Sequence, residues 1–168
     1  EQREQLKSLN RLKELAQRQH DLNERLKELQ TALQEAKSAE EREEIRRRLK
    51  RLREEEQEIL ADLDEMRQRM ARAETPQMSQ SLQQLDQTRA EVRQAAEALE
   101  DSAVSQALAA GTRAQRELQE LREDFRKQTA SQFSDEMRQM RGEARQLAQR
   151  EEEIGKKLDA AAESQRKS

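Results

Sequence analysis

The residues that could do chemistry are few in this 168-residue chain, and their spacing does not assemble a catalytic site. His20 is the single histidine, it stands between Gln19 and Asp21, and the chain has no cysteine. A metal site needs three or four clustered ligands, whereas the acidic residues here are scattered over every face of the expected helices. No glycine-rich phosphate-binding motif occurs, and most serines lie far along the chain from His20. We therefore expect a protein that is not an enzyme and that uses no cofactor and no metal.

One basic cluster, Arg46 to Arg53, could contact phosphate groups. The candidate contacts are Arg46, Arg47, Lys50 and Arg51. Glutamates stand four residues before Arg47 and Arg48, which is the favoured order for ion pairs on one helix, and three more glutamates follow the cluster. The chain also has no aromatic side chain there to stack on a base. These neighbours favour an ion-paired surface over a nucleic-acid- or phosphate-binding arm, which stays as the alternative.

A group of soft apolar residues could form an adaptable patch for a protein partner, because methionine is flexible and polarisable. The candidates are Met66, Met70, Met78, Phe125, Phe133 and Met137. Such residues also fill irregular cores, and here they stand where the apolar spacing is irregular. We favour the core interpretation over the patch.

The composition predicts helices throughout. Charged residues make up 41% of the chain and aromatic residues 1%, with one proline and three glycines, so the strand-forming, turn-rich makeup of a globular domain is missing. The net charge of −3 gives no steering field for nucleic acid or an anionic membrane. No apolar run approaches the roughly 20 residues of a membrane span, and no signal peptide is present. Because the chain starts at Glu1 without a methionine, we expect it to be a fragment or a processed piece.

Apolar residues that alternate at three- and four-residue intervals predict a single coiled-coil segment over residues 1–168. The expected helices cover about 1–36, 39–73, 76–100, 103–128 and 130–163, with continuity through Thr129 left open. Ser38 followed by Glu41 forms a capping-box pattern. Thr75 before Pro76 suits a helix start, and Asp101 or Ser102 can cap the next helix.

The stripes also predict how the helices pair. If the chain turns at Glu100 to Ala103, facing positions such as Leu85 and Leu118 have residue numbers that add to 203. The same sum pairs residues 45–70 with residues 133–158, and it places Glu56 and Glu151 in the seam. The first helix folds back on the second with a sum near 78. We predict an elongated all-α antiparallel coiled coil, with a three-helix bundle at one end and a two-helix hairpin stalk at the other.

Three stretches resemble the helical extramembrane regions of large bacterial membrane-anchored proteins of unknown function. They are EEREEIRRRLKRLREEEQEILADLDEMRQRM (40–70), ALAAGTRAQRELQELREDFRKQ (107–128) and FSDEMRQMRGEARQLAQREEEI (133–154). The resemblance implies a bacterial origin and an envelope setting, with the chain outside the bilayer.

These features together predict a structural or scaffolding coiled-coil segment that mediates spacing or protein–protein contact in a larger bacterial envelope protein. We expect a protein partner or self-association rather than nucleic acid, and no direct membrane insertion within the segment. The localisation stays unknown apart from the envelope setting that the resemblance implies.

Overall fold

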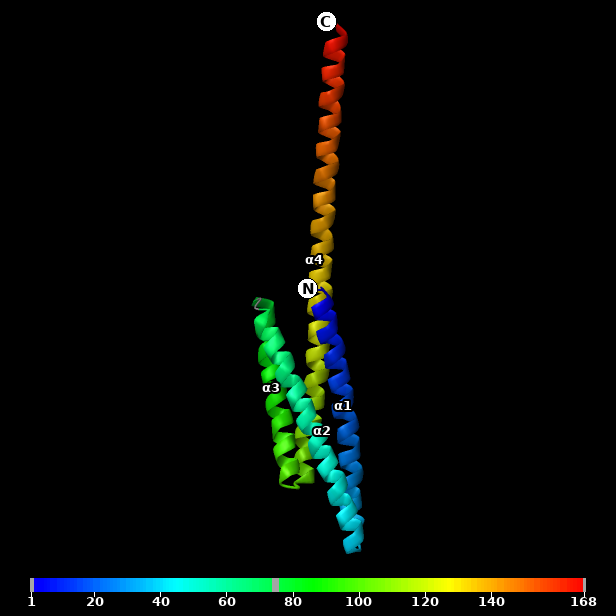
Figure 1. Ribbon diagram of the computed structural model, residues 1–168, viewed down its shortest axis with the longest axis vertical. Coiled ribbons are helices and arrows are strands. Elements are labelled where there is room, and N and C mark those ends of the chain that lie inside the picture. Colours follow the sequence, from blue (N-terminus) through cyan, green and yellow to red (C-terminus); the bar gives the residue numbers. More distant parts are fainter. Residues whose placement is uncertain (1, 74–75, 168) are drawn as a thin grey trace. The chain divides into compact units, whose positions relative to one another are not determined.

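The computed structural model describes residues 2–73 and 76–167, and four α-helices account for nearly all of them. α1 spans Gln2–Glu35, α2 Ala39–Arg72, α3 Pro76–Glu100 and α4 Val104–Lys167 (Figure 1). No strand occurs among the described residues, so the all-α prediction is confirmed. The helices expected at 103–128 and 130–163 form one continuous helix, α4, because neither proline nor glycine interrupts the chain near Thr129.

The chain divides into two compact units, Glu1–Arg126 and Lys127–Ser168. The single coiled-coil segment over residues 1–168 stays a prediction. The N-terminal unit contains α1, α2, α3 and the first part of α4, and it has a continuous hydrophobic core. The C-terminal unit consists of the remainder of α4. α4 therefore contributes to both units.

α1 and α2 are antiparallel neighbours in the N-terminal unit. Arg18 Nη1 donates to Asp62 Oδ2 at 2.6 Å, and Arg25 Nη1 donates to Glu55 Oε1 at 3.0 Å. The numbers of both pairs (18 with 62, 25 with 55) add to 80, close to the predicted sum of 78.

The turn between α1 and α2 follows the capping-box pattern. Ser38 has an extended backbone and its hydroxyl accepts from the Glu41 N–H at 3.1 Å. The Glu41 carboxylate in turn accepts from the Lys37 N–H at 3.0 Å. These bonds satisfy donors that the first turn of α2 leaves open, which fixes where α2 begins.

The prediction that α2 and α3 run on as one arm of a long hairpin is wrong. α2 packs against α3, and Arg89 Nη2 and Arg67 Nε each lie 2.5 Å from an aspartate of the other helix, Asp64 and Asp86 respectively. The chain therefore reverses between α2 and α3, and the proposed helix cap at Thr75 lies outside the described residues. A return at Pro76 lets the α2 stripe pack on both α1 and α3, whereas a two-helix stalk would leave it partly exposed.

The predicted partners of α2 in the stalk are consequently not in the core. The structure leaves this set exposed: Phe133, Met137, Met140, Leu147, Ile154 and Leu158. The α2 residues meant to face them are buried in the N-terminal unit, from Ile45 to Met70. The α2 stripe is thus already covered within the N-terminal unit, which contradicts its predicted place in a two-helix stalk.

Side chains of α3 and the first part of α4 are hydrogen-bonded to one another in antiparallel order. Arg113 Nε donates to Glu91 Oε2 at 2.9 Å, and Gln84 Nε2 donates to Asp124 Oδ2 at 2.9 Å. The tip differs from the prediction, because neither Asp101 nor Ser102 caps α4. Instead Ser102 adopts a left-handed φ of 55° and closes α3, with the Ala103 N–H bonded to the Ala98 carbonyl.

The buried face of α3 is turned relative to the predicted stripe. Ser81, Thr88 and Ala95 are buried, whereas Leu82 and Arg89 are only half-buried. α3 has two neighbours rather than one, and short side chains let a second helix approach closely. A prediction based on one neighbouring helix could not identify these short residues as buried.

Candidate functional site

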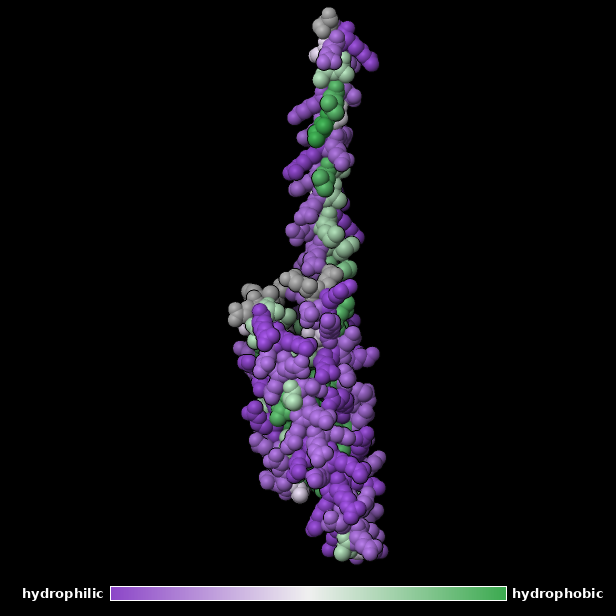
Figure 2. Space-filling model, viewed as in Figure 1, coloured by the Kyte–Doolittle hydropathy of each residue, from purple (hydrophilic) through white to green (hydrophobic). Residues whose placement is uncertain are grey.

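The C-terminal unit carries an apolar stripe along α4. Its large members are Phe133, Met137, Met140, Leu147, Ile154 and Leu158. They follow one another at intervals of three, four or seven residues, so they share one face of the helix. Between 37% and 65% of each residue is exposed, and Figure 2 shows these green side chains along an otherwise purple helix. An exposed stripe of this extent is typical of an interaction site.

Charged residues border one side of the stripe in a fixed order. Glu136 and Glu143 come first, and Arg150 and Lys157 follow at the same seven-residue interval. The sign of the border therefore reverses near the middle of the unit. On the other side, Arg141 is followed at the same interval by alanine and glycine.

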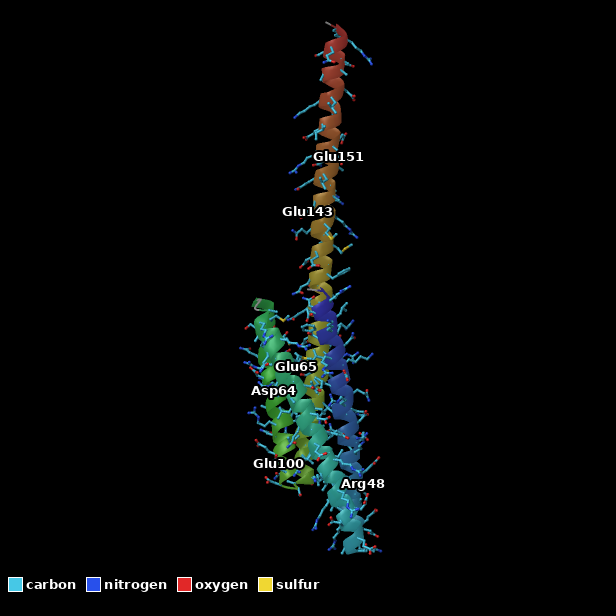
Figure 3. The ribbon with its side chains drawn as sticks, in the orientation of Figure 1. Arg48, Asp64, Glu65, Glu100, Glu143 and Glu151 are labelled. Carbon is cyan, nitrogen blue, oxygen red and sulfur yellow. The ribbon has the colours of Figure 1, made fainter. Side chains whose placement is uncertain are left out.

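Glu151 interrupts the stripe and is exposed, which corrects its predicted place in the seam with α2. Figure 3 shows Glu151 and Glu143 on this part of α4. Glu56, the other glutamate predicted in a seam, is fully buried on α2. The same position in the repeat thus has opposite surroundings in the two units.

Glu56 lies in the core of the N-terminal unit without a cationic partner. Neither of its carboxylate oxygens accepts a hydrogen bond of ordinary geometry, and the Oε1 of Gln19 is likewise buried without a donor. Burial raises the pKa of Glu56 to about 8, and Glu55 adds to the rise, while the nearby Gln19 amide offsets part of it. At neutral pH the side chain is therefore mainly a neutral carboxylic acid.

A chain of side-chain hydrogen bonds connects this level of α1 to α4. Gln19 Nε2 donates to Asn23 Oδ1 at 3.0 Å, and Asn23 Nδ2 donates to the Gly111 carbonyl and to Gln115 Oε1, each at 2.9 Å. Gln115 Nε2 lies 2.9 Å from His20 Nδ1. His20 is half-buried and belongs to this polar layer.

Sequence reasoning missed Asn23 in this layer. Asn23 lies beside the narrow two-helix seam, but a helix packed on more than one neighbour buries a wider face. Gly111 is the sequence feature that could have indicated this layer, because a Cβ at that position would collide with the Asn23 amide oxygen. A glycine on the seam of α4 marks the close approach of another polar side chain.

The structure divides the predicted methionine patch between the two units. Met66, Met70 and Phe125 are buried in the core of the N-terminal unit, and Met78 packs against that core. Phe133 and Met137 belong to the C-terminal unit and are exposed. The first four fill a core, and only the last two are placed to meet a partner.

The basic cluster is interleaved with acids on the surface of α2, where Figure 3 marks Arg48. Arg46 and Arg47 each lie 3.6 Å from a glutamate three residues earlier, and Arg48 lies 3.5 Å from Glu44. Arg51 lines a groove that also contains Glu28 and Glu55, and Lys50 is exposed. Nothing in this arrangement favours phosphate binding, which stays a prediction.

Within residues 2–73 and 76–167, no group of three or more histidine or acidic side chains is arranged to hold a metal ion. None of the described helices is both long enough and apolar enough to cross a membrane. The exposed stripe of the C-terminal unit is therefore the strongest candidate site.

Comparison with known proteins finds no family model, no curated protein and no solved structure that matches this chain.

Proposed function

We propose that the chain is a structural or scaffolding segment of a larger bacterial envelope protein, and that it acts through the apolar stripe of its C-terminal unit. The envelope setting rests on the resemblance of residues 40–70, 107–128 and 133–154 to extramembrane helical regions of such proteins. The stripe supplies the contact, and the helix supplies a spacer of defined length.

The observation that carries the proposal is the exposure of six large apolar residues on one helical face. Exposed apolar surface costs free energy in water, and the same repeat in the N-terminal unit is buried against neighbouring helices. A helix without a partner would avoid this cost with polar residues at the stripe positions, and this helix has large apolar residues there. A partner helix that covers the stripe is the arrangement that this repeat favours.

The finer architecture belongs to the same proposal. We infer that α1 with α2, and α3 with the first part of α4, pack side by side as antiparallel coiled coils. The ion pairs at Arg18, Arg25 and Arg113 support this register. Two such pairs, joined through α2 and α3, make up the N-terminal unit.

Site-specific photo-crosslinking in cells that produce the full chain tests the proposal. A photoreactive residue at Leu147 lies in the stripe, whereas one at Gln149 lies on the opposite face of the same helical turn and serves as the matched control. We expect discrete crosslinked products from Leu147 and none from Gln149. Equal or absent crosslinking at the two positions would contradict a contact through the stripe.

A further inference from the structure

We propose that the stripe of the C-terminal unit pairs with the same stripe of a second copy, in an antiparallel arrangement that places Phe133 opposite Leu158. This inference rests on the proposed function and names its partner. Facing residue numbers then add to 291, so that every stripe position from 133 to 158 meets a stripe position of the other copy. The overlap covers 26 residues, or about 39 Å of helix.

The charged border of the stripe is complementary to itself only when the two copies run in opposite directions. Antiparallel pairing brings the acidic half of one border, Glu136 and Glu143, against the basic half of the other, Arg150 and Lys157. The pairs are Glu136 with Lys157 and Glu143 with Arg150, and each occurs twice by symmetry. No like-charged pair is formed along this border.

The N-terminal unit contains an observed example of the same geometry. In α1 and α2 the residues that precede the seam, Arg18 and Arg25, pair with Asp62 and Glu55, which occupy the equivalent place on the antiparallel neighbour. The numbers of these pairs add to 80, two more than the seam sum of 78. Glu143 with Arg150 adds to 293, again two more than the seam sum of 291. The border charges thus fall where this chain already forms interhelical ion pairs.

A parallel pair fits the same residues less well. Glu136 would still find an arginine, Arg141 of the second copy, but the two basic border residues would face glycine and alanine. Glu151 would also meet its own copy across the seam, and like charges at such a position repel. In the antiparallel pair Glu151 faces Met140, whose sequence neighbour Arg141 can reach the carboxylate.

The exposed apolar area of the stripe comes close to what a specific dimer buries. Taking about 150–200 Å² for each large apolar side chain, the exposed fractions amount to roughly 500–650 Å² per copy. Two copies would bury roughly 1,000–1,300 Å², which reaches the lower range of specific interfaces. Small residues on the second border, Ala148 and Gly155, allow the helices to approach closely.

Single-cysteine variants of the full chain test the orientation. Phe133→Cys alone and Leu158→Cys alone should form little disulfide dimer under mild oxidation, because identical positions lie about 37 Å apart in the antiparallel pair. An equimolar mixture of the two should crosslink readily, since facing Cα atoms lie within disulfide range. Crosslinking of Phe133→Cys with itself would instead show a parallel pair and overturn the proposal.

Charge reversal tests the border in the same full chain, with association measured by analytical ultracentrifugation. A basic variant (Glu136→Lys, Glu143→Lys) and an acidic variant (Arg150→Glu, Lys157→Glu) should each raise the dimer dissociation constant at least about tenfold. Their mixture should restore association as a heterodimer. Far-ultraviolet circular dichroism checks that each variant stays helical.

The outcomes separate this inference from the proposed function. A wild-type chain that stays monomeric at about 100 µM, where even a modest dimer would form, refutes self-pairing. Crosslinking at Leu147 to a product of different mass would then retain the proposed contact while identifying another partner. An acidic variant that dimerises as well as the wild type would refute the antiparallel border.

Discussion

Glu56→Gln should stabilise the N-terminal unit, and the gain should grow with pH. Glu56 is fully buried, and burial raises its pKa from 4.5 to about 8. A raised folded-state pKa means that the folded protein holds the proton more tightly than the unfolded chain. The stability that this proton provides is complete below pH 4.5 and is lost as the pH rises to about 8. Glutamine keeps the shape of the protonated acid and has no proton to lose.

The magnitude follows from the shift. One pKa unit corresponds to about 1.4 kcal/mol, so the free energy of unfolding should fall by about 5 kcal/mol between pH 4.5 and pH 8 through this group alone. At pH 7 the loss is about 3 kcal/mol. Protonated Glu56, or the glutamine amide, can donate to the Gln19 Oε1 that otherwise lacks a donor. The variant should therefore match the wild type to within about 0.5 kcal/mol at pH 4.5 and exceed it by about 5 kcal/mol at pH 9.

Urea unfolding followed by circular dichroism, at intervals from pH 4.5 to pH 9, measures this difference. Subtracting the two proteins at each pH cancels the titration of all other carboxylates. Glu54→Gln is the matched control, because Glu54 is exposed on the same helix, and it should change stability by less than about 0.5 kcal/mol. A difference between Glu56→Gln and the wild type that stays constant with pH, or that grows toward acid, would refute the burial of an ionisable Glu56.

Two backbone sites give further predictions, both measured by urea or thermal unfolding. Gly111→Ala should lower the free energy of unfolding by about 1–3 kcal/mol, because the new methyl group displaces the hydrogen-bonded Asn23 amide, whereas Gly142→Ala, with nothing nearby, should raise it by up to about 1 kcal/mol. If both glycine variants gained stability, the polar layer would not be closed around Asn23. Ser102→Gly should raise stability by about 1 kcal/mol, because Ser102 holds a left-handed conformation, whereas Gln106→Gly in the adjacent helix should lower it by a similar amount. A loss of stability in Ser102→Gly would show that α3 does not end as described.

Local signals in the sequence were sufficient to predict the helices and two of their turns. Ser38 and Glu41 set the start of α2 through bonds within a few residues of chain, and the α1–α2 ion pairs lie near the predicted register. The α3–α4 tip was placed correctly, but its closure through Ser102 was not, because Ser102 carries no glycine signal for a left-handed residue. Short-range chemistry was therefore predictable wherever the usual residue types were used.

The pairing of α2 could not be predicted from its spacing. The α2 stripe from Ile45 to Met70 has the same intervals as the stripe from Phe133 to Leu158, so an equal sum of residue numbers fits both. Repeats of this kind match many partners, and only the return of the chain before Pro76 decides that α2 packs on α3. The polar layer at Asn23 was missed for a related reason. The prediction considered only the residues between α1 and α2, whereas Asn23 faces a third helix, α4.

Glu56 and Glu151 show why burial, rather than repeat position, decides what a seam residue does. Both occupy the same place in the heptad, but only Glu56 has helices packed around it, and only there does an acidic side chain become costly to ionise. A shifted alignment of α1 and α2 would separate Glu56 from the polar side chains at its level. Glu56 therefore helps to fix the register of α1 against α2. Glu151 is exposed and stays ionised at no such cost until a second helix covers the stripe. A neighbouring cation such as Arg141 of a second copy is then required, and that requirement selects the antiparallel pair over the parallel one.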